Sequence, residues 1–310
     1  MSDYSTIRAS APGSIMLMGE HAVLRGELAI ACAVNRYIHV ELTPRTDSEV
    51  HIHSALGDYQ ARLDALPDAP ELQFVVTALR QWRPKLPAGL ELRIESEFSH
   101  KVGLGSSAAV IAALTAALDR FAATGLTREQ QFDAALKTIH AVQNGRGSGT
   151  DLAASLYGGL IAYRVSPREL RPLHGTPTLS LWYVGYKMKT PAVLELVERK
   201  TAAYPQLYAE LDRLMGRCCE QAQQAIEAGD WPALGELMKL YQGLMDALGV
   251  NDANLSELVY RLRATDGILG AKISGSGLGD CVVALGEGDP GALPYERIPV
   301  GVSARGTECI

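Results

Sequence analysis

A run of small residues at 102–110 has the composition of a phosphate-binding loop that leads into a helix. It reads Val-Gly-Leu-Gly-Ser-Ser-Ala-Ala-Val, and an alanine- and leucine-rich stretch typical of a buried helix follows it. Glycines let the backbone approach a ligand closely, and the start of a helix offers unpaired N–H groups and the positive end of the helix dipole. Because Gly-Ser-Ser also caps ordinary helices, the run taken alone favours a helix cap over a phosphate loop.

Asp151 is the candidate proton acceptor of the chain. It follows the glycine-rich turn 145–149 and precedes a run of small residues, so its carboxylate could accept a proton from an attacking hydroxyl. An aspartate after a turn is also a common helix N-cap, and the spacing alone favours that structural role.

Two further segments could line a binding site. An apolar strand in 9–18 ends at Gly-Glu-His, where Glu20 and His21 could orient a hydroxylated or anionic substrate, although a solvated turn fits the spacing slightly better. A glycine-rich segment at 272–281 could line a nucleotide or phosphate from the opposite side, or it could be a tight turn between strands. Its candidate residues are Gly275, Ser276 and Gly277.

Hydrophobic periodicity predicts the strands and helices that must position these segments. Strands are expected at 29–34, 37–42, 90–96, 160–164, 179–184 and 280–285, with a partly exposed strand pair in 46–61. Helices are expected at 71–82, after the loop at 102–110, at 127–142, across 191–248, and from Asn254 as N-cap to Arg263. Thr127 and Gln130 have the spacing of a capping box.

The composition predicts a soluble cytoplasmic protein that binds neither nucleic acid nor membrane. The 310 residues are 47% hydrophobic, enough for a large core, and the net charge of −6 is unlike that of a nucleic-acid binder. No apolar run reaches the length of a membrane span, and the first residues lack a signal-peptide core. The five cysteines are odd in number and lack zinc-ligand spacing, which indicates a reducing compartment.

The four segments occur in an order that resembles the motifs of the GHMP kinases, the superfamily of galactokinase, homoserine kinase, mevalonate kinase and phosphomevalonate kinase. The matching motifs are Ala-Pro-Gly-x-x-x-x-x-Gly-Glu-His, Gly-Leu-Gly-Ser-Ser-Ala-Ala, Gly-Ser-Gly-x-Asp and Ser-Gly-x-Gly, and they span residues 9–281. Each motif is weak alone, but four in order make a chance match improbable.

The resemblance implies an α+β fold of two domains. Residues 1–170 would form an ATP-binding domain similar to domain 2 of ribosomal protein S5, and residues 171–310 a ferredoxin-like C-terminal domain. The expected boundary lies in a stretch rich in proline and glycine between 164 and 179.

The resemblance also implies a reaction, the transfer of the γ-phosphoryl group of ATP to a hydroxyl of a small anionic substrate. Asp151 would be the catalytic carboxylate, and Ser107 would bind Mg²⁺ through its hydroxyl. The ATP phosphates would lie against Gly103, Leu104, Gly105, Ser106, Ser107 and Ala108. The substrate would contact Ser14, Glu20, His21, Gly275, Ser276 and Gly277. A homodimer is among the assemblies that this family resemblance allows.

Two subfamilies share features with the chain. The sequence Gly-Glu-His at 19–21, together with the residues after it, is most similar to the corresponding segment of mevalonate kinases. The residues at 100–107, the turn at 143–149 and an aspartate at 280, where mevalonate kinases usually carry glycine, look more like phosphomevalonate kinase. We predict mevalonate as the acceptor, with phosphomevalonate as the alternative.

Two departures from the family pattern add further alternatives. Mevalonate kinases usually have lysine where this chain has Ser14, and the candidates for a replacement cation are Lys101, Lys187 and Arg146. The family's Mg²⁺-binding glutamate also lacks a counterpart, since His140 falls at about its spacing and is best interpreted as an ordinary helix histidine. A lyase similar to diphosphomevalonate decarboxylase and a non-catalytic sensor of nucleotide and metabolite are therefore also considered.

Overall fold

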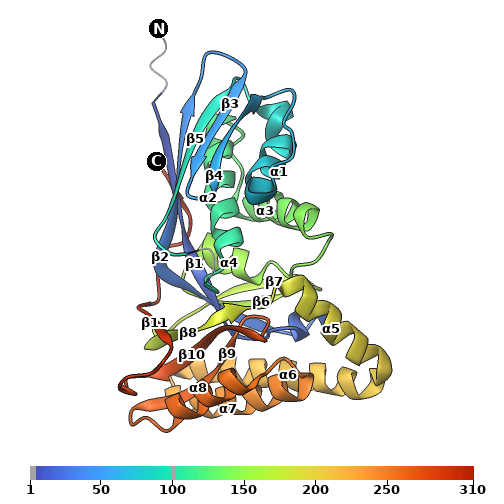
Figure 1. Ribbon diagram of the computed structural model, residues 1–310, viewed down its shortest axis with the longest axis vertical. Helices are drawn as coiled ribbons and strands as arrows, with labels where there is room; N and C mark the ends of the chain where they lie inside the picture. Colours follow the sequence, from blue (N-terminus) through green and yellow to red (C-terminus); the bar gives the residue numbers. More distant parts are fainter. Residues whose placement is uncertain (1–4, 100–101) are drawn as a thin grey trace.

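The chain forms two β-sheets with helices packed on them, as seen in a computed structural model that describes residues 5–99 and 102–310 (Figure 1). The first sheet has eight strands within the described residues. They are β1 Ile7–Met18, β2 Ala29–Pro44, β3 Glu49–Ser54, β4 Gly57–Arg62, β5 Leu90–Ser96, β6 Leu160–Arg164, β7 Glu169–Leu173 and β12 Glu308–Cys309. Its helices are α1 Gln73–Trp82, α2 Ser106–Phe121, α3 Arg128–Val142 and α4 Thr150–Tyr157.

β2 is the strand that joins two parts of the first sheet. The sequence predicts two short strands at 29–34 and 37–42, and the structure merges them into one strand that pairs with β1 along most of its length. The first half of β2 also pairs with β6, whereas the second half pairs with β5. β1 and β2 extend beyond the helical layer toward the second sheet (Figure 1).

α2 is the central helix of the first half. Alanine and leucine are buried around most of its circumference, and it packs on β1, β2, α3 and α4. Small side chains allow this close approach on several sides. This packing fixes the position of the N-terminus of α2, which directly follows the loop of small residues.

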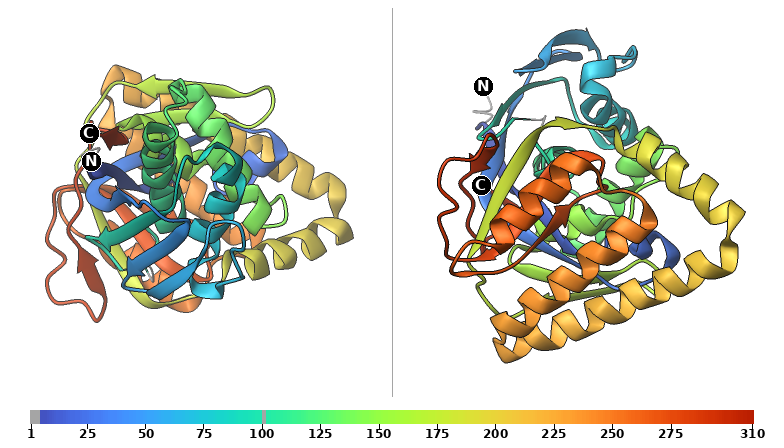
Figure 2. Two further views of the ribbon diagram at one scale, coloured as in Figure 1. Left: turned by 90° about the horizontal axis from the view of Figure 1, so that it is seen from above. Right: turned by 60° about the horizontal axis from the view of Figure 1, so that its bottom comes forward.

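The second sheet has the strand order β11-β8-β10-β9, with helices packed beneath it. Its strands are β8 Leu179–Lys187, β9 Ile268–Ser274, β10 Gly279–Gly286 and β11 Glu296–Ile298. The predicted helical region 191–248 consists of α5 Thr190–Ala203, α6 Pro205–Ala228 and α7 Trp231–Leu248, and α8 Ala253–Arg263 follows. α5 and one end of α6 project away from the body of the molecule (Figure 2).

One of the two large buried clusters spans both halves of the molecule. The largest buried cluster includes Ile15 and Leu17 of β1 together with Ile273 of β9 and Val283 of β10. The ends of β1 and β2 thus pack directly on the second sheet, and the turn that follows β1 is fixed relative to β9.

The sequence predicts most of these elements correctly. The predicted α+β class is confirmed, as are the capping box at Thr127 and Gln130, the strand at 90–96 and the strand at 160–164. The N-cap of α8 is wrongly predicted as Asn254, because the Asp252 carboxylate accepts the Leu255 N–H at 3.0 Å.

The stretch rich in proline and glycine is more ordered than predicted. It contains β7, which pairs with β6 in the first sheet, and the boundary between 170 and 171 falls within this strand. β12 also returns to the first sheet, where it pairs with β1. The division into 1–170 and 171–310 stays a prediction.

All five cysteines are free thiols. Among the described residues, no helix combines the length and the apolar composition needed to cross a membrane.

Candidate active site

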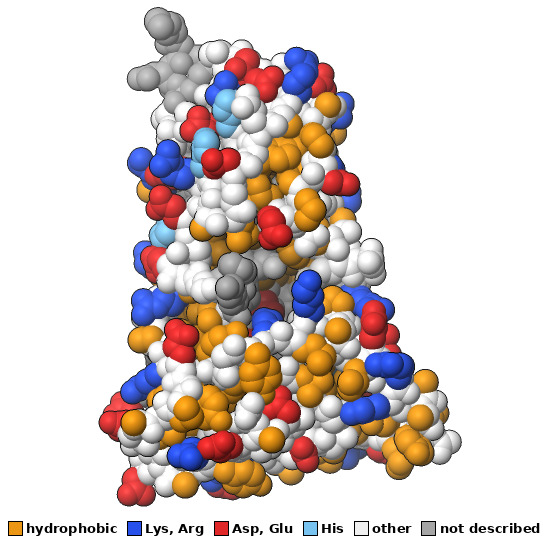
Figure 3. Space-filling view, in the orientation of Figure 1, with side chains coloured by type: hydrophobic (Ala, Val, Ile, Leu, Met, Phe, Trp, Pro, Cys, Tyr) orange, Lys and Arg blue, Asp and Glu red, His pale blue; other side chains and the backbone are white. Residues whose placement is uncertain are grey.

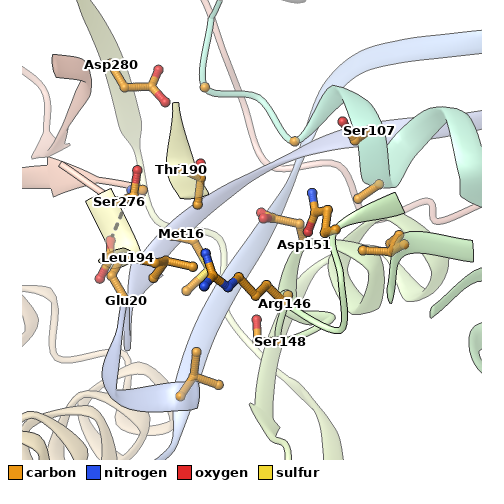
Figure 4. Close-up of a pocket in the computed structure, with 18 of the residues that line it drawn as sticks. Met16, Glu20, Ser107, Arg146, Ser148, Asp151, Thr190, Leu194, Ser276 and Asp280 are labelled. Carbon is orange, nitrogen blue, oxygen red and sulfur yellow. Dashed lines mark hydrogen bonds between the residues drawn. The ribbon is translucent and has the colours of Figure 1, made fainter. Parts of the chain in front are cut away.

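A pocket of about 270 Å³ lies where the two halves meet (Figure 3). Residues from all four sequence segments line it, together with the start of α5. Figure 4 shows Ser107 and Asp151 on one side of the pocket and Ser276 and Asp280 on the other. The predicted site residues that line the pocket are Gly103, Gly105, Ser106, Ser107, Ala108, Asp151, Glu20, His21, Gly275 and Ser276.

The loop of small residues presents an uncapped helix N-terminus to the pocket. α2 begins at Ser106 after Gly105, which has a left-handed φ of 61°, and no side chain caps the helix. The helix-cap interpretation of this run is therefore wrong within the described residues, and the first N–H groups of α2 are available to an anion. Leu104 instead points into the core, while its carbonyl accepts the Ser14 N–H at 3.0 Å.

Two glycines of this loop are required by close packing. A Cβ atom on Gly103 would lie 2.3 Å from Asp280 Oδ1, and one on Gly105 would lie 2.1 Å from Ser14 Oγ. A Cβ at either position would force the neighbouring side chain to shift, so the two glycines let the loop pack against the Asp280 carboxylate and the Ser14 hydroxyl.

Asp151 is presented to the pocket by the first turn of α4. The helix begins at Thr150 after Gly149, and no side chain caps it, so the predicted N-cap role of Asp151 is wrong. Its Oδ1 atom instead accepts a hydrogen bond of 2.8 Å from Ser14 Oγ. Burial raises the pKa of Asp151, while this hydrogen bond and the positive charge of Lys187 oppose the rise.

Ser14 lies behind Asp151 and does not line the pocket itself. It is fully buried on β1, where the strand pairing is irregular between Pro12 and Ser14. The hydroxyl contacts the carboxylate, so the structure gives Ser14 the position of an orienting residue for Asp151.

Glu20 forms a buried ion pair that the sequence analysis does not anticipate. Lys272 Nζ lies 2.5 Å from Glu20 Oε1, and the two side chains are 0% and 2% exposed. Tyr241 donates a 3.0 Å hydrogen bond to the Glu20 carbonyl, and Lys272 lies over the Tyr241 ring. Burial raises the pKa of Glu20, and Lys272 opposes this effect. One carboxylate oxygen is thus already bound, although Glu20 lies at the pocket wall as predicted.

His21 joins the first and fourth segments across the pocket. Its ring Nε2 donates to the Ser276 carbonyl at 2.8 Å, and burial lowers the pKa of the ring. Gly275 lies next to Glu20, with its N–H 3.4 Å from Glu20 Oε1. Gly277 does not line the pocket, since it packs against the Val250 backbone instead.

The three candidate cations have different surroundings. Lys187 lines the pocket and pairs with Asp280 at 2.6 Å. Arg146 also lines it and lies 3.4 Å from Glu195 and 3.7 Å from Glu198 of α5. Lys101 lies outside the described residues.

His140 has a structural contact, as the sequence interpretation expects. Its Nε2 donates to the Gly147 carbonyl at 2.9 Å and ties α3 to the glycine-rich turn. Among the described residues, no group of three or more His, Cys, Asp or Glu side chains could hold a metal ion.

Sequence reasoning missed several residues of the site. Lys272 is the clearest case, because a lysine between the buried Ala271 and Ile273 in a short apolar strand signals an internal partner. The pocket residues of α5, namely Thr190, Pro191 and Leu194, carry no comparable signal, since only the packing of this helix brings them there.

Comparisons with known proteins assign the chain to a family. The GHMP kinases N terminal domain family matches residues 73–159, and the GHMP kinases C terminal family matches residues 222–293. A protein of Aeropyrum pernix named mevalonate kinase is 32% identical over 286 residues, covering 90% of this chain and 88% of that relative. This chain belongs to the GHMP kinases, a family of phosphotransferases that use ATP.

Solved structures share the fold over nearly the whole chain. The Lin0012 protein from Listeria innocua matches with a TM-score of 0.88 at 22% identity and covers 99% of both chains. The L. major mevalonate kinase, solved in complex with R-mevalonate, matches with a TM-score of 0.73 at 26% identity, covering 89% of this chain and 86% of that one.

Removal of the buried lysine should destabilise the protein strongly. Lys272→Met leaves the Glu20 carboxylate buried without its partner, which costs about 3–5 kcal/mol. We expect the free energy of unfolding, measured by urea denaturation, to fall by that amount.

Two variants serve as controls for this measurement. Lys239→Met removes a lysine that pairs with Glu236 on the helix surface, and it should change the free energy of unfolding by less than about 0.5 kcal/mol. The double variant Glu20→Gln/Lys272→Met should be more stable than Lys272→Met alone, because no charge is left buried. Equal stability of Lys272→Met and wild type would contradict the internal ion pair.

Proposed function

We propose that this protein transfers the γ-phosphoryl group of ATP to a hydroxyl of mevalonate. The observation that carries the proposal is the position of Asp151, which lines a pocket beside the uncapped N-terminus of α2. Relatives over 90% of the chain are named mevalonate kinase, and they support this acceptor.

Asp151 is the proposed general base. The hydroxyl oxygen of the acceptor bonds to the γ-phosphorus, the bond from that phosphorus to the β–γ bridging oxygen breaks, and ADP leaves. The hydroxyl proton passes to the Asp151 carboxylate. Ser14 orients this carboxylate and keeps its pKa lower than burial alone would set it.

The ATP phosphates are proposed to lie against the loop from Gly103 to Ala108. Free N–H groups and the dipole of α2 favour negative charge at this point, and Ser106 and Ser107 line the pocket. Ser107 is the proposed protein ligand for Mg²⁺, which takes oxygen ligands and keeps several waters when it binds with phosphates. A single hydroxyl beside the phosphate position fits that preference, and the ion would neutralise phosphate charge.

The acceptor is proposed to occupy the opposite part of the pocket. His21, Gly275 and Ser276 line this part, with Glu20 behind them. Because Glu20 Oε1 is bound to Lys272, we propose that Glu20 acts mainly by holding the Gly-Glu-His turn in place.

The alternatives have weaker support. The relatives' names do not favour phosphomevalonate as acceptor. A non-catalytic sensor does not require a carboxylate held at the pocket by a hydrogen bond from a buried serine. A decarboxylase-like lyase would differ from the proposed kinase by releasing CO₂ with ATP hydrolysis. A homodimer and a cytoplasmic location stay predictions.

Mevalonate should be the preferred acceptor in an assay of ADP release. We expect turnover with ATP, Mg²⁺ and mevalonate, and much slower turnover with phosphomevalonate, galactose or homoserine. Asp151→Asn should lower kcat about 10²- to 10⁴-fold, because the amide cannot accept the proton. Asp58→Asn, at an exposed position in β4, is the matched control and should keep wild-type kcat. Wild-type kcat in Asp151→Asn would refute the role of this residue.

The pH dependence of kcat should report the hydrogen bond from Ser14. Asp151 must be ionised to accept a proton, so kcat falls as the pH drops through its pKa. Ser14→Ala removes a contact that lowers this pKa, and the acid limb of the profile should move to higher pH. Ser155→Ala is the control, because this serine is also fully buried but its hydroxyl has no partner among the described residues. An unchanged acid limb in Ser14→Ala would contradict the proposed coupling.

A further inference from the structure

Lys187 and Asp280 form an ion pair at the edge of the pocket. Lys187 Nζ lies 2.6 Å from Asp280 Oδ2, and the two side chains are 33% and 5% exposed. Both residues line the pocket, and Figure 4 shows Asp280 across it from Asp151 and Ser107. The carboxylate is therefore buried, while the ammonium group keeps access to the cavity.

Asp280 is held in an unfavourable conformation. Its φ of 71° lies in the left-handed region, which residues with a side chain adopt rarely, although aspartate does so more often than most. The pairing of β10 with β8 shifts register between Gly279 and Cys281, and this irregularity places Asp280 beside Lys187. Asp280 Oδ1 is buried without a partner among the described residues. Strain and an unsatisfied carboxylate oxygen together indicate a functional role.

On balance, the two charges of the pair favour the ionised form of Asp151. Lys187 lowers the pKa of Asp151 and Asp280 raises it, and the effect of Lys187 is the larger of the two. An ammonium group has three donors, of which Asp280 Oδ2 accepts one. The other two can reach a ligand in the cavity.

The other described cations near the site pair with glutamates. Arg146 faces two glutamates of α5, and Lys272 is buried against Glu20. Ser14, which occupies the position behind Asp151, is neutral. Among the described residues that line the pocket, Lys187 is the cation whose charge lowers the pKa of Asp151, and its partner Asp280 lies against Gly103.

We propose that Lys187 contacts the transferred phosphoryl group and neutralises its negative charge, with Asp280 as the positioning residue that holds Lys187 there. This inference rests on the proposed function. Charge on the phosphoryl oxygens must be stabilised during transfer, and a fixed lysine in a partly enclosed site does this effectively. The hydroxyl proton of the acceptor passes to Asp151, and Lys187 contributes its positive charge.

Substitution of Lys187 tests the catalytic part of the proposal. Lys187→Met should lower kcat about 10²- to 10³-fold and change the KM for mevalonate much less. The acid limb of the kcat profile should move to higher pH, because a charge that lowers the pKa of Asp151 is gone. Lys187→Arg should recover part of kcat because it keeps the positive charge, whereas a purely structural lysine would lower the melting temperature of Lys187→Met and leave the acid limb of its kcat profile in place.

Substitution of Asp280 tests the positioning part. Asp280→Gly relieves the left-handed φ and removes the buried carboxylate, so its melting temperature should equal or exceed that of wild type. We nevertheless expect kcat to fall about tenfold, because Lys187 loses its anchor. An effect on activity without loss of stability separates positioning from folding.

A matched control and the wild-type rate distinguish failure of this inference from failure of the proposed function. Lys189→Met changes an exposed lysine two residues away and should keep wild-type kcat. Absence of wild-type turnover with mevalonate would refute the proposed function, and the Lys187 variants would then be compared on the acceptor that wild type does phosphorylate. Wild-type kcat in Lys187→Met on that acceptor would overturn the present inference.

Discussion

Glu20 and Lys272 form an ion pair in the interior of the molecule, and the rest of the pocket is arranged around it. The pair connects the turn after β1 to β9, so it fixes the first sheet relative to the second. His21 bonds to Ser276 beside it, and Tyr241 bonds to the Glu20 carbonyl. A buried charge pair tolerates little displacement, because either partner alone would be left unsolvated. The two walls of the pocket therefore keep a defined separation.

The glycines of the loop serve packing and function together. Gly103 and Gly105 have no room for a Cβ because Asp280 and Ser14 lie against them. The same contacts bring the N-terminus of α2 close to Asp151, so a helix end that favours anions lies beside the proposed base. The loop thus depends on residues from β1 and β10, which are remote from it in sequence.

Charge in the pocket is distributed differently from what the family resemblance implies. Ser14 is neutral where a lysine is expected, and Asp280 adds a carboxylate where glycine is expected. These departures are complementary in space, because Asp280 holds Lys187 at the pocket and Ser14 contacts Asp151.

The sequence by itself determined the local elements and the motif residues. Periodicity and capping signals are short-range, which is why β5, β6 and the capped helix α3 are predicted correctly and Asp151 is recognised. Only the tertiary structure decided the partners of Glu20 and Asp151. Glu20 and Lys272 are 252 residues apart, and Ser14 and Asp151 are 137 apart. Pairing over such separations depends on how sheets and helices pack, and no local pattern in the chain encodes it.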